Sequence, residues 1–196
     1  MADEQSLLES GDSVLWIVTA RSGQRTGGLV ATFVNTAAIT PQCPRVIVGL
    51  ARSHHTWELV EASEAFALHQ IAEKQIDWVW RFGLRSGRNY DKFGDLNWRS
   101  GATGSPILDD AIGWLDCRVE ARMETGDRTI YLAEIVDAQV RGPGRPLTVK
   151  RMLELASPQQ VQELKQQRSQ DAAADAEIIR QWREMQAGSH SHRKTV

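Results

Sequence analysis

The sequence predicts a mainly β protein: one small antiparallel β-barrel with short peripheral helices and a C-terminal helical extension. Residues 115–124 alternate strictly between apolar and charged side chains, which is typical of an antiparallel strand with one solvent-exposed face. Gly126 and Asp127 offer a hairpin turn before a return strand at 129–140. The strands are not interleaved regularly with helices, so a doubly wound parallel sheet is not expected.

The earlier elements follow from β-branched and apolar runs bounded by turn residues. Strands are predicted over residues 13–20, 28–34, 45–51 and 65–71. The run at 45–51 is apolar on both faces and predicts a central strand. Helical spacing predicts a helix over 56–62, with Thr56 as its N-cap.

The return strand has a less regular pattern. Its predicted apolar face consists of Ile130, Leu132, Val136, Ala138 and Val140. Glu134 interrupts that face, which indicates either a β-bulge or a carboxylate with a buried partner.

The C-terminal part is predicted to be helical. Residues 147–156 predict one helix, and Ser157 with Pro158 predicts the start of another. Its apolar stripe of Ile178, Trp182 and Met185 is expected to dock on the barrel or on a partner subunit. The predicted organisation is a flexible lead-in at 1–12, a barrel domain at 13–146, a helical extension at 147–187 and a disordered tail at 188–196.

Composition excludes several classes of protein. The 23 Lys and Arg residues balance 25 Asp and Glu residues, so no nucleic-acid partner is expected. A polar, acidic start and the lack of a long apolar run argue against a secretory signal and a membrane span, so a cytoplasmic location is expected. Cys43 and Cys117 fit no metal or redox spacing and are interpreted as reduced thiols. Rossmann, P-loop and esterase motifs are absent from the sequence.

Two segments have residue types suited to binding a flat, phosphorylated ligand. In residues 28–41 a strand leads into small and hydroxylic residues, and Thr32, Asn35 and Thr36 can donate hydrogen bonds. An ordinary strand with a polar turn is the alternative. In residues 51–57 a strand ends where a helix begins, a position suited to phosphate. A simple capped helix start and a weak metal site at the paired histidines remain open there.

These segments, in this order, resemble the FMN-binding core of the flavin reductase-like family, which has the split-barrel fold. Gly28, Ala31, Thr32, Thr36 and Pro41 fit its first run, and 52–56 resembles its serine-rich turn. Later elements at 91–93, 104–108, 114–119 and 126–130 are also similar, so the likeness extends over roughly residues 13–142.

The resemblance implies the cofactor, the co-substrate and the residues that would bind them. It implies bound FMN, with FAD as an alternative, and NAD(P)H as the hydride donor. It also implies a homodimer and a partner monooxygenase, but no catalytic side chain and no metal. His54 and Arg128 are candidates for contacting NAD(P)H. The expected flavin-binding residues are Ala31, Thr32, Phe33, Val34, Asn35, Thr36, Ala51, Arg52, Ser53 and Thr56.

Three positions depart from the family pattern. Val30 and Ala38 replace common hydroxyl residues, and Arg128 replaces the histidine of a Gly-Asp-His turn. The last departure favours alternatives on the same fold: an FMN-binding electron carrier, a flavin-dependent oxidase or a haem-related activity.

Further candidates have a structural and a functional interpretation. The basic residues Arg81, Arg85, Arg88 and Lys92 are expected to form a solvated face, with phosphate binding as the alternative. The tryptophans at 16, 78, 80 and 114 are expected to fill the core rather than to stack on a flavin.

Overall fold

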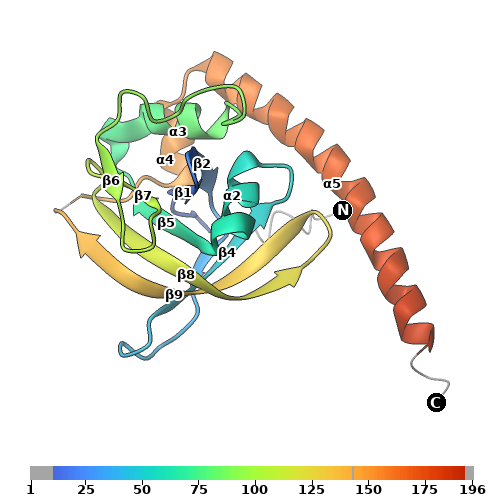
Figure 1. Ribbon diagram of the computed structural model, residues 1–196. Coiled ribbons are helices and arrows are strands. Elements are labelled where there is room, and N and C mark those ends of the chain that lie inside the picture. Colours follow the sequence, from blue (N-terminus) through green and yellow to red (C-terminus); the bar gives the residue numbers. More distant parts are fainter. Residues whose placement is uncertain (1–10, 143, 193–196) are drawn as a thin grey trace.

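The computed structural model describes residues 11–142 and 144–192, with side chains described to Gly188. One seven-stranded sheet dominates it, in the order β2-β1-β5-β8-β9-β4-β3, with antiparallel neighbours throughout. The sheet curls into a half-barrel, which confirms the predicted fold class (Figure 1). The strands of this sheet are β1 (Trp16–Ser22), β2 (Arg25–Ala31), β3 (Val34–Thr36), β4 (Arg45–Ala51), β5 (Ala65–Gln70), β8 (Gly113–Glu124) and β9 (Arg128–Val140).

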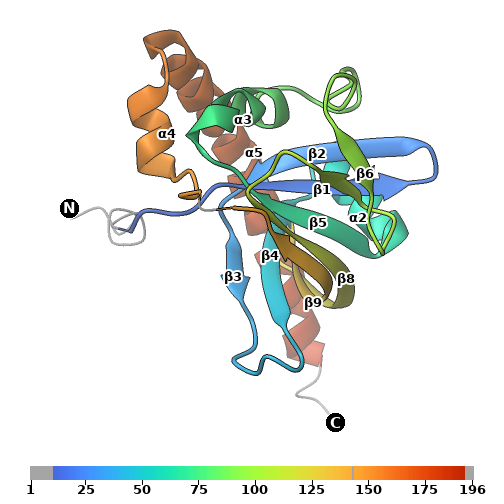
Figure 2. The same ribbon diagram turned by 90° about the vertical axis from the view of Figure 1, so that its left-hand side faces the viewer.

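The remaining elements surround this sheet. Strands β6 (Trp98–Ser100) and β7 (Pro106–Leu108) form a separate pair. Figure 2 shows α3 and α4 beside one end of the sheet, and the long α5 passing behind it. The helices are α2 (His55–Ser63), α3 (Ile76–Gly83) preceded by a short 3-10 turn (Glu73–Gln75), α4 (Val149–Leu155) and α5 (Pro158–His192).

The core has two main parts. The first fills the curl of the sheet and is covered by α2 through Leu59 and Val60. The second joins the first strand to α3 and α4, and includes Trp78 and Met152. The expectation that the four tryptophans pack in the interior is confirmed, because each is buried or packs against one of the core clusters.

A buried histidine joins three strands in this core. His69 on β5 is fully buried, and its Nδ1 lies 3.1 Å from the carbonyl oxygen of Ile17 on β1. Its Nε2 accepts a hydrogen bond from the N–H of Leu108 on β7 at 3.1 Å. Because Nε2 is the acceptor, Nδ1 must carry the proton, and the ring is neutral. Burial lowers the pKa of His69 to about 4.

The predicted faces of the long hairpin are wrong for β9 and for the end of β8, and its ladder contains two bulges. Glu120 on β8 and Val136 on β9 are each an extra residue in the ladder, so the side chains beyond each bulge change face. Consequently Met123 is 60% exposed, although it was predicted to share an inner face with the fully buried Cys117. On β9 the buried residues are Thr129, Tyr131 and Ala133, the face opposite to the predicted one. Glu134 is exposed, so the expectation of a buried partner is wrong, and the bulge lies two residues later.

Other expectations also need correction. Strand β4 is not central: it lies next to the edge strand β3 and leaves Ile47 exposed. The N-cap of α2 is His54, while Thr56 is buried inside the first turn. Helix α5 continues to His192, so residues 188–192 of the expected disordered tail are helical. Residues 1–10 of the expected lead-in and 193–196 of the tail lie outside the described residues.

Candidate functional site

The structure distributes the predicted flavin residues over two separate cavities. The first, of about 620 Å³, is lined by Thr32, Val34, Asn35 and Thr36, together with the loop between β3 and β4. One basic side chain, Arg45, lines it, and Glu120 pairs with that guanidinium at 2.8 Å. This cavity therefore offers hydroxyl and amide groups but little free positive charge.

The second cavity, of about 470 Å³, has a different chemistry. Ser53, His54 and Thr56 line it from the turn between β4 and α2. Arg85, Arg88 and Lys92 line it from the loop that follows α3; these three are called the basic floor below. Close packing brings the two segments together: a Cβ at Gly87 would lie 3.2 Å from the ring of His55.

Hydrogen bonds fix the basic floor in place. Arg88 donates from Nη1 to the carbonyl oxygen of Ser53 at 3.0 Å and from Nη2 to Glu58 at 2.6 Å. Lys92 is buried, and its Nζ donates to the carbonyl oxygens of Gly28 and Phe82, both at 2.8 Å.

The charges of the floor suit an anion. Burial lowers the pKa of Lys92 to about 8, so the ammonium still carries most of its charge at neutral pH. The guanidinium of Arg85 lies over the Tyr90 ring, 4.6 Å from its centre. The cavity thus presents the guanidinium of Arg85, the ammonium of Lys92 and the guanidinium of Arg88, whose charge Glu58 partly offsets. The hydroxyls of Ser53, Thr56 and Ser86 also line it, and together these donors suit a phosphate ester.

The adjacent histidines have distinct environments. Burial lowers the pKa of His54, and the carboxylate of Asp171 on α5 opposes that shift. His55 Nδ1 lies 3.1 Å from a carboxylate oxygen of Glu58. No group of three or more His, Cys, Asp or Glu side chains with metal-binding geometry occurs in the described part of the chain.

Several predicted site residues line neither cavity. Ala31 is buried in the core, and Ala51 pairs with Arg128 in the β4–β9 ladder. Arg52 lies over the Trp57 ring, 5.3 Å from its centre and 3.7 Å from Glu124, so the structure does not place it in the basic floor as expected. Its outward direction follows from the end of β4, where the backbone of Arg52 still donates to the carbonyl oxygen of Asp127.

Arg128, the predicted nicotinamide contact, is held by three neighbours. It donates from Nε to Asp127 at 2.5 Å and from Nη2 to Asp175 on α5 at 3.3 Å. Its guanidinium also lies 4.9 Å from the ring centre of Phe33, whose side chain is 60% exposed. Arg128 therefore connects the loop before β3 to the C-terminal helix.

The basic residues of the second cavity depart from the expectation of a solvated face. A solvated face was expected for residues 81–92, and Arg81 does pair with Asp95 at the surface. The other three basic residues face the second cavity. The signal available in the sequence was the Gly, Ser and Arg composition of residues 83–88, which suits a tight loop around an anion. Nothing in the sequence indicated that residues of α5 would line this cavity.

Several known proteins are similar to this chain in sequence. The chain is 31% identical to the high molecular weight rubredoxin of Moorella thermoacetica over 136 residues, 68% of this chain and 58% of that protein. It is 29% identical to the ferric-chelate reductase (NAD(P)H) of Archaeoglobus fulgidus, over 68% of this chain and 79% of the relative. It is also 30% identical to the reductase subunit of a flavin-dependent monooxygenase from Mycobacterium tuberculosis, over 50% of this chain and 51% of that subunit.

A solved structure supports the same fold. The flavin reductase domain protein of Arthrobacter sp. FB24 superposes with a TM-score of 0.64 and 25% identity, covering 74% of this chain and 90% of the other.

The chain spans only 58% and 22% of the first two curated relatives that it matches. The described part of the chain contains no helix that is long and apolar enough to cross a membrane. Residues 11–152 match the model of the flavin reductase like domain, and the chain therefore belongs to this family, as its sequence motifs indicated.

Proposed function

We propose that this protein binds FMN and transfers hydride from a nicotinamide nucleotide to the flavin, as an NAD(P)H-dependent flavin reductase. The second cavity carries this proposal, because it combines the predicted turn at 53–56 with the basic floor. In this proposal the FMN phosphate binds the floor and accepts hydrogen bonds from Ser53 and Thr56.

The residues present fit such a cofactor. A volume of about 470 Å³ lies in the usual range for small-ligand sites. A phosphate monoester matches the guanidinium of Arg85, the ammonium of Lys92 and the hydroxyls that line the cavity. FAD, whose phosphates would also suit the floor, stays the alternative flavin. The first cavity, with its neutral hydroxyl and amide groups, would receive an uncharged portion of a ligand rather than a phosphate.

The flavin supplies the acceptor for two electrons, and the chain supplies binding and orientation. No side chain needs to act as an acid, base or nucleophile. The neutral form of His54, favoured by burial, would allow a ring nitrogen to donate or accept a hydrogen bond at the cavity. Relatives named as a ferric-chelate reductase (NAD(P)H) and as a monooxygenase reductase subunit support NAD(P)H as donor and a monooxygenase as partner for this chain.

An exposed apolar strip supports the proposal of a homodimer. The bulge at Glu120 directs Met123 outward, where it pairs across the ladder with Ile130. Ile47 is paired with Leu132 on the same outer surface and is 39% exposed. We expect the Met123→Glu/Ile47→Glu double variant to sediment at half the mass of the wild type, and a wild type that is already monomeric would end this part of the proposal.

A specific observation favours a second candidate, an FMN-binding electron carrier or a flavin-dependent oxidase without reductase activity. Arg128 is already bound by two carboxylates, so it is less available to a nicotinamide nucleotide than the family histidine that it replaces.

Steady-state oxidation of NADH and NADPH separates these candidates. A reductase consumes the nucleotide in proportion to enzyme when FMN is added, and Arg128→Ala should raise the KM for the nucleotide. A protein that binds FMN but oxidises neither nucleotide is instead the electron carrier or oxidase. An absorbance spectrum of the purified protein distinguishes flavin from haem.

A further inference from the structure

Helix α5 lies outside the family match yet borders the cavity that we assign to the flavin phosphate. The match ends at residue 152, whereas α5 begins at Pro158. Five of its side chains line the second cavity together with the basic floor: Glu163, Gln166, Gln167, Gln170 and Asp171. The helix closes one side of the cavity without filling it, since about 470 Å³ remains.

Helix α5 is attached by a few apolar and polar contacts rather than by a buried face. Among its described side chains, residues 158–188, none is buried. Leu164 packs on the second core cluster near the start of the helix. Further along, Asp175 accepts a hydrogen bond from Arg128 at 3.3 Å, and Trp182 lies against the hairpin at Gly126 (Figure 1). These contacts hold the helix on both sides of its cavity-lining segment.

We infer that α5 is a binding wall outside the matched domain, whose Gln167, Gln170 and Asp171 recognise the sugar hydroxyls of a phosphorylated nucleotide held on the basic floor. Glutamine amides both donate and accept, and a carboxylate accepts from hydroxyls, as acidic residues do for ribose in dinucleotide sites. The floor provides positive charge for the phosphate, and the wall provides neutral and acidic groups for the adjoining polyhydroxyl chain.

The same chemistry occurs in two ligands: the ribityl phosphate of FMN and the ribose phosphates of NAD(P)H. The inference rests on the proposed function. Asp175 is a positioning residue, which keeps the wall in place through its ion pair with Arg128.

The test compares Gln167→Ala/Gln170→Ala with the matched control Gln162→Ala, an exposed glutamine of the same helix that does not line the cavity. Each lost hydrogen bond should weaken binding about 2- to 10-fold. Fluorescence titration with FMN alone and KM for NADH at saturating FMN assign the loss to one ligand or the other, and a loss in either supports the wall. Unchanged values in both, or tighter binding once the side chains are removed, would overturn it.

Positioning by Asp175 has a separate readout. Asp175→Asn should accelerate hydrogen exchange of the α5 amides and weaken the same ligand, and Asp175→Glu should restore both. Unchanged exchange in Asp175→Asn would refute this role. If wild-type protein binds no FMN, the proposed function itself fails; if it binds FMN and only the wall variants have no effect, the failure belongs to α5 alone.

Discussion

The buried histidine His69 gives a quantitative test of how the fold responds to acid. In the folded state its pKa is lowered from 6.5 to about 4, because burial disfavours the charged ring and the hydrogen bond to Ile17 opposes this only in part. The unfolded chain therefore takes up a proton below pH 6.5, whereas the folded chain does not until about pH 4. Stability must fall as the pH decreases through this window.

The size of the effect follows from the two pKa values. The difference of about 2.5, at 1.36 kcal/mol for each pH unit, amounts to about 3 kcal/mol. This is a large part of the roughly 5–15 kcal/mol by which domains are stable. Salt-bridged carboxylates such as Glu58 and Glu73 have lowered pKa values, so their protonation reduces stability mainly at lower pH.

The assay is urea unfolding between pH 7 and pH 4 on the wild type and His69→Gln. An amide retains one donor and one acceptor but does not titrate, so the variant should lack about 3 kcal/mol of the wild type's pH dependence, whatever its stability at pH 7. Parallel loss of stability in both proteins would refute the assignment of this window to His69.

Three further predictions concern other parts of the molecule. Native protein should react with a thiol reagent at one site per chain, because Cys43 is exposed while burial raises the pKa of Cys117; two fast thiols would contradict this. Gly126→Ala should cost about 1–2 kcal/mol and speed hydrogen exchange in α5, since φ is +96° and the new Cβ would lie 2.8 Å from Trp182 Cβ; unaltered exchange would contradict the contact. Lys92→Met should destabilise by about 2 kcal/mol in urea, because two buried carbonyls lose their donor; a variant as stable as the wild type would contradict it.

The fold class was predictable because local patterns dominate in antiparallel sheets. The hairpin at Gly126 and the strand at 65–70 form where alternation and turn residues indicated them. The outward face of β8 beyond Glu120 was not predictable, since a one-residue bulge inverts every later side chain and leaves no clear mark in the sequence. On β9 the prediction was wrong because the outer face carries the apolar Ile130 and Leu132, while the buried face includes the polar Thr129. Strands β6 and β7, three residues each, are too short for a periodic signal.

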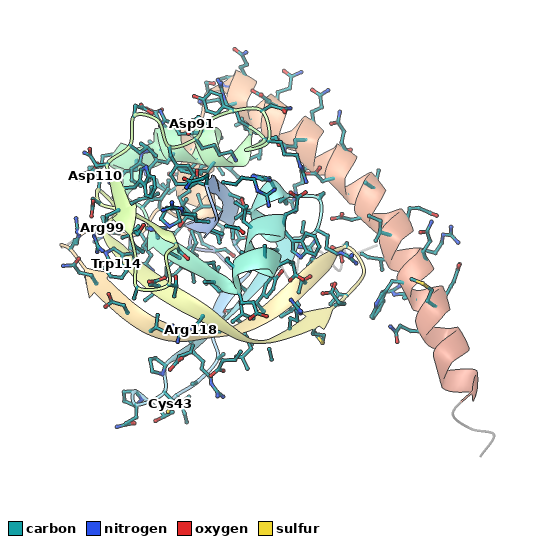
Figure 3. All side chains as sticks on the ribbon, in the orientation of Figure 1. Cys43, Asp91, Arg99, Asp110, Trp114 and Arg118 are labelled. Atoms are coloured by element: carbon teal, nitrogen blue, oxygen red, sulfur yellow. The ribbon has the colours of Figure 1, made fainter. Side chains whose placement is uncertain are left out.

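The candidate site was only partly predictable. The turn at 53–56 lines a cavity as expected, but Arg52 points away from it and the basic floor takes its place. The floor comes from a loop about 30 residues later in the chain, and packing of α3 on the sheet brings it close. Figure 3 shows Cys43 at the far end of the β3–β4 loop, well away from Asp91 in the loop that follows α3.

The most direct test of the central proposal compares FMN with riboflavin, which lacks the phosphate. Fluorescence quenching of each flavin by the purified protein should show one FMN per chain, with riboflavin bound at least about tenfold more weakly. Arg85→Gln should reduce this difference by weakening FMN alone. Equal affinity for the two flavins, or no binding of FMN at tens of micromolar, would contradict a phosphate site on the basic floor.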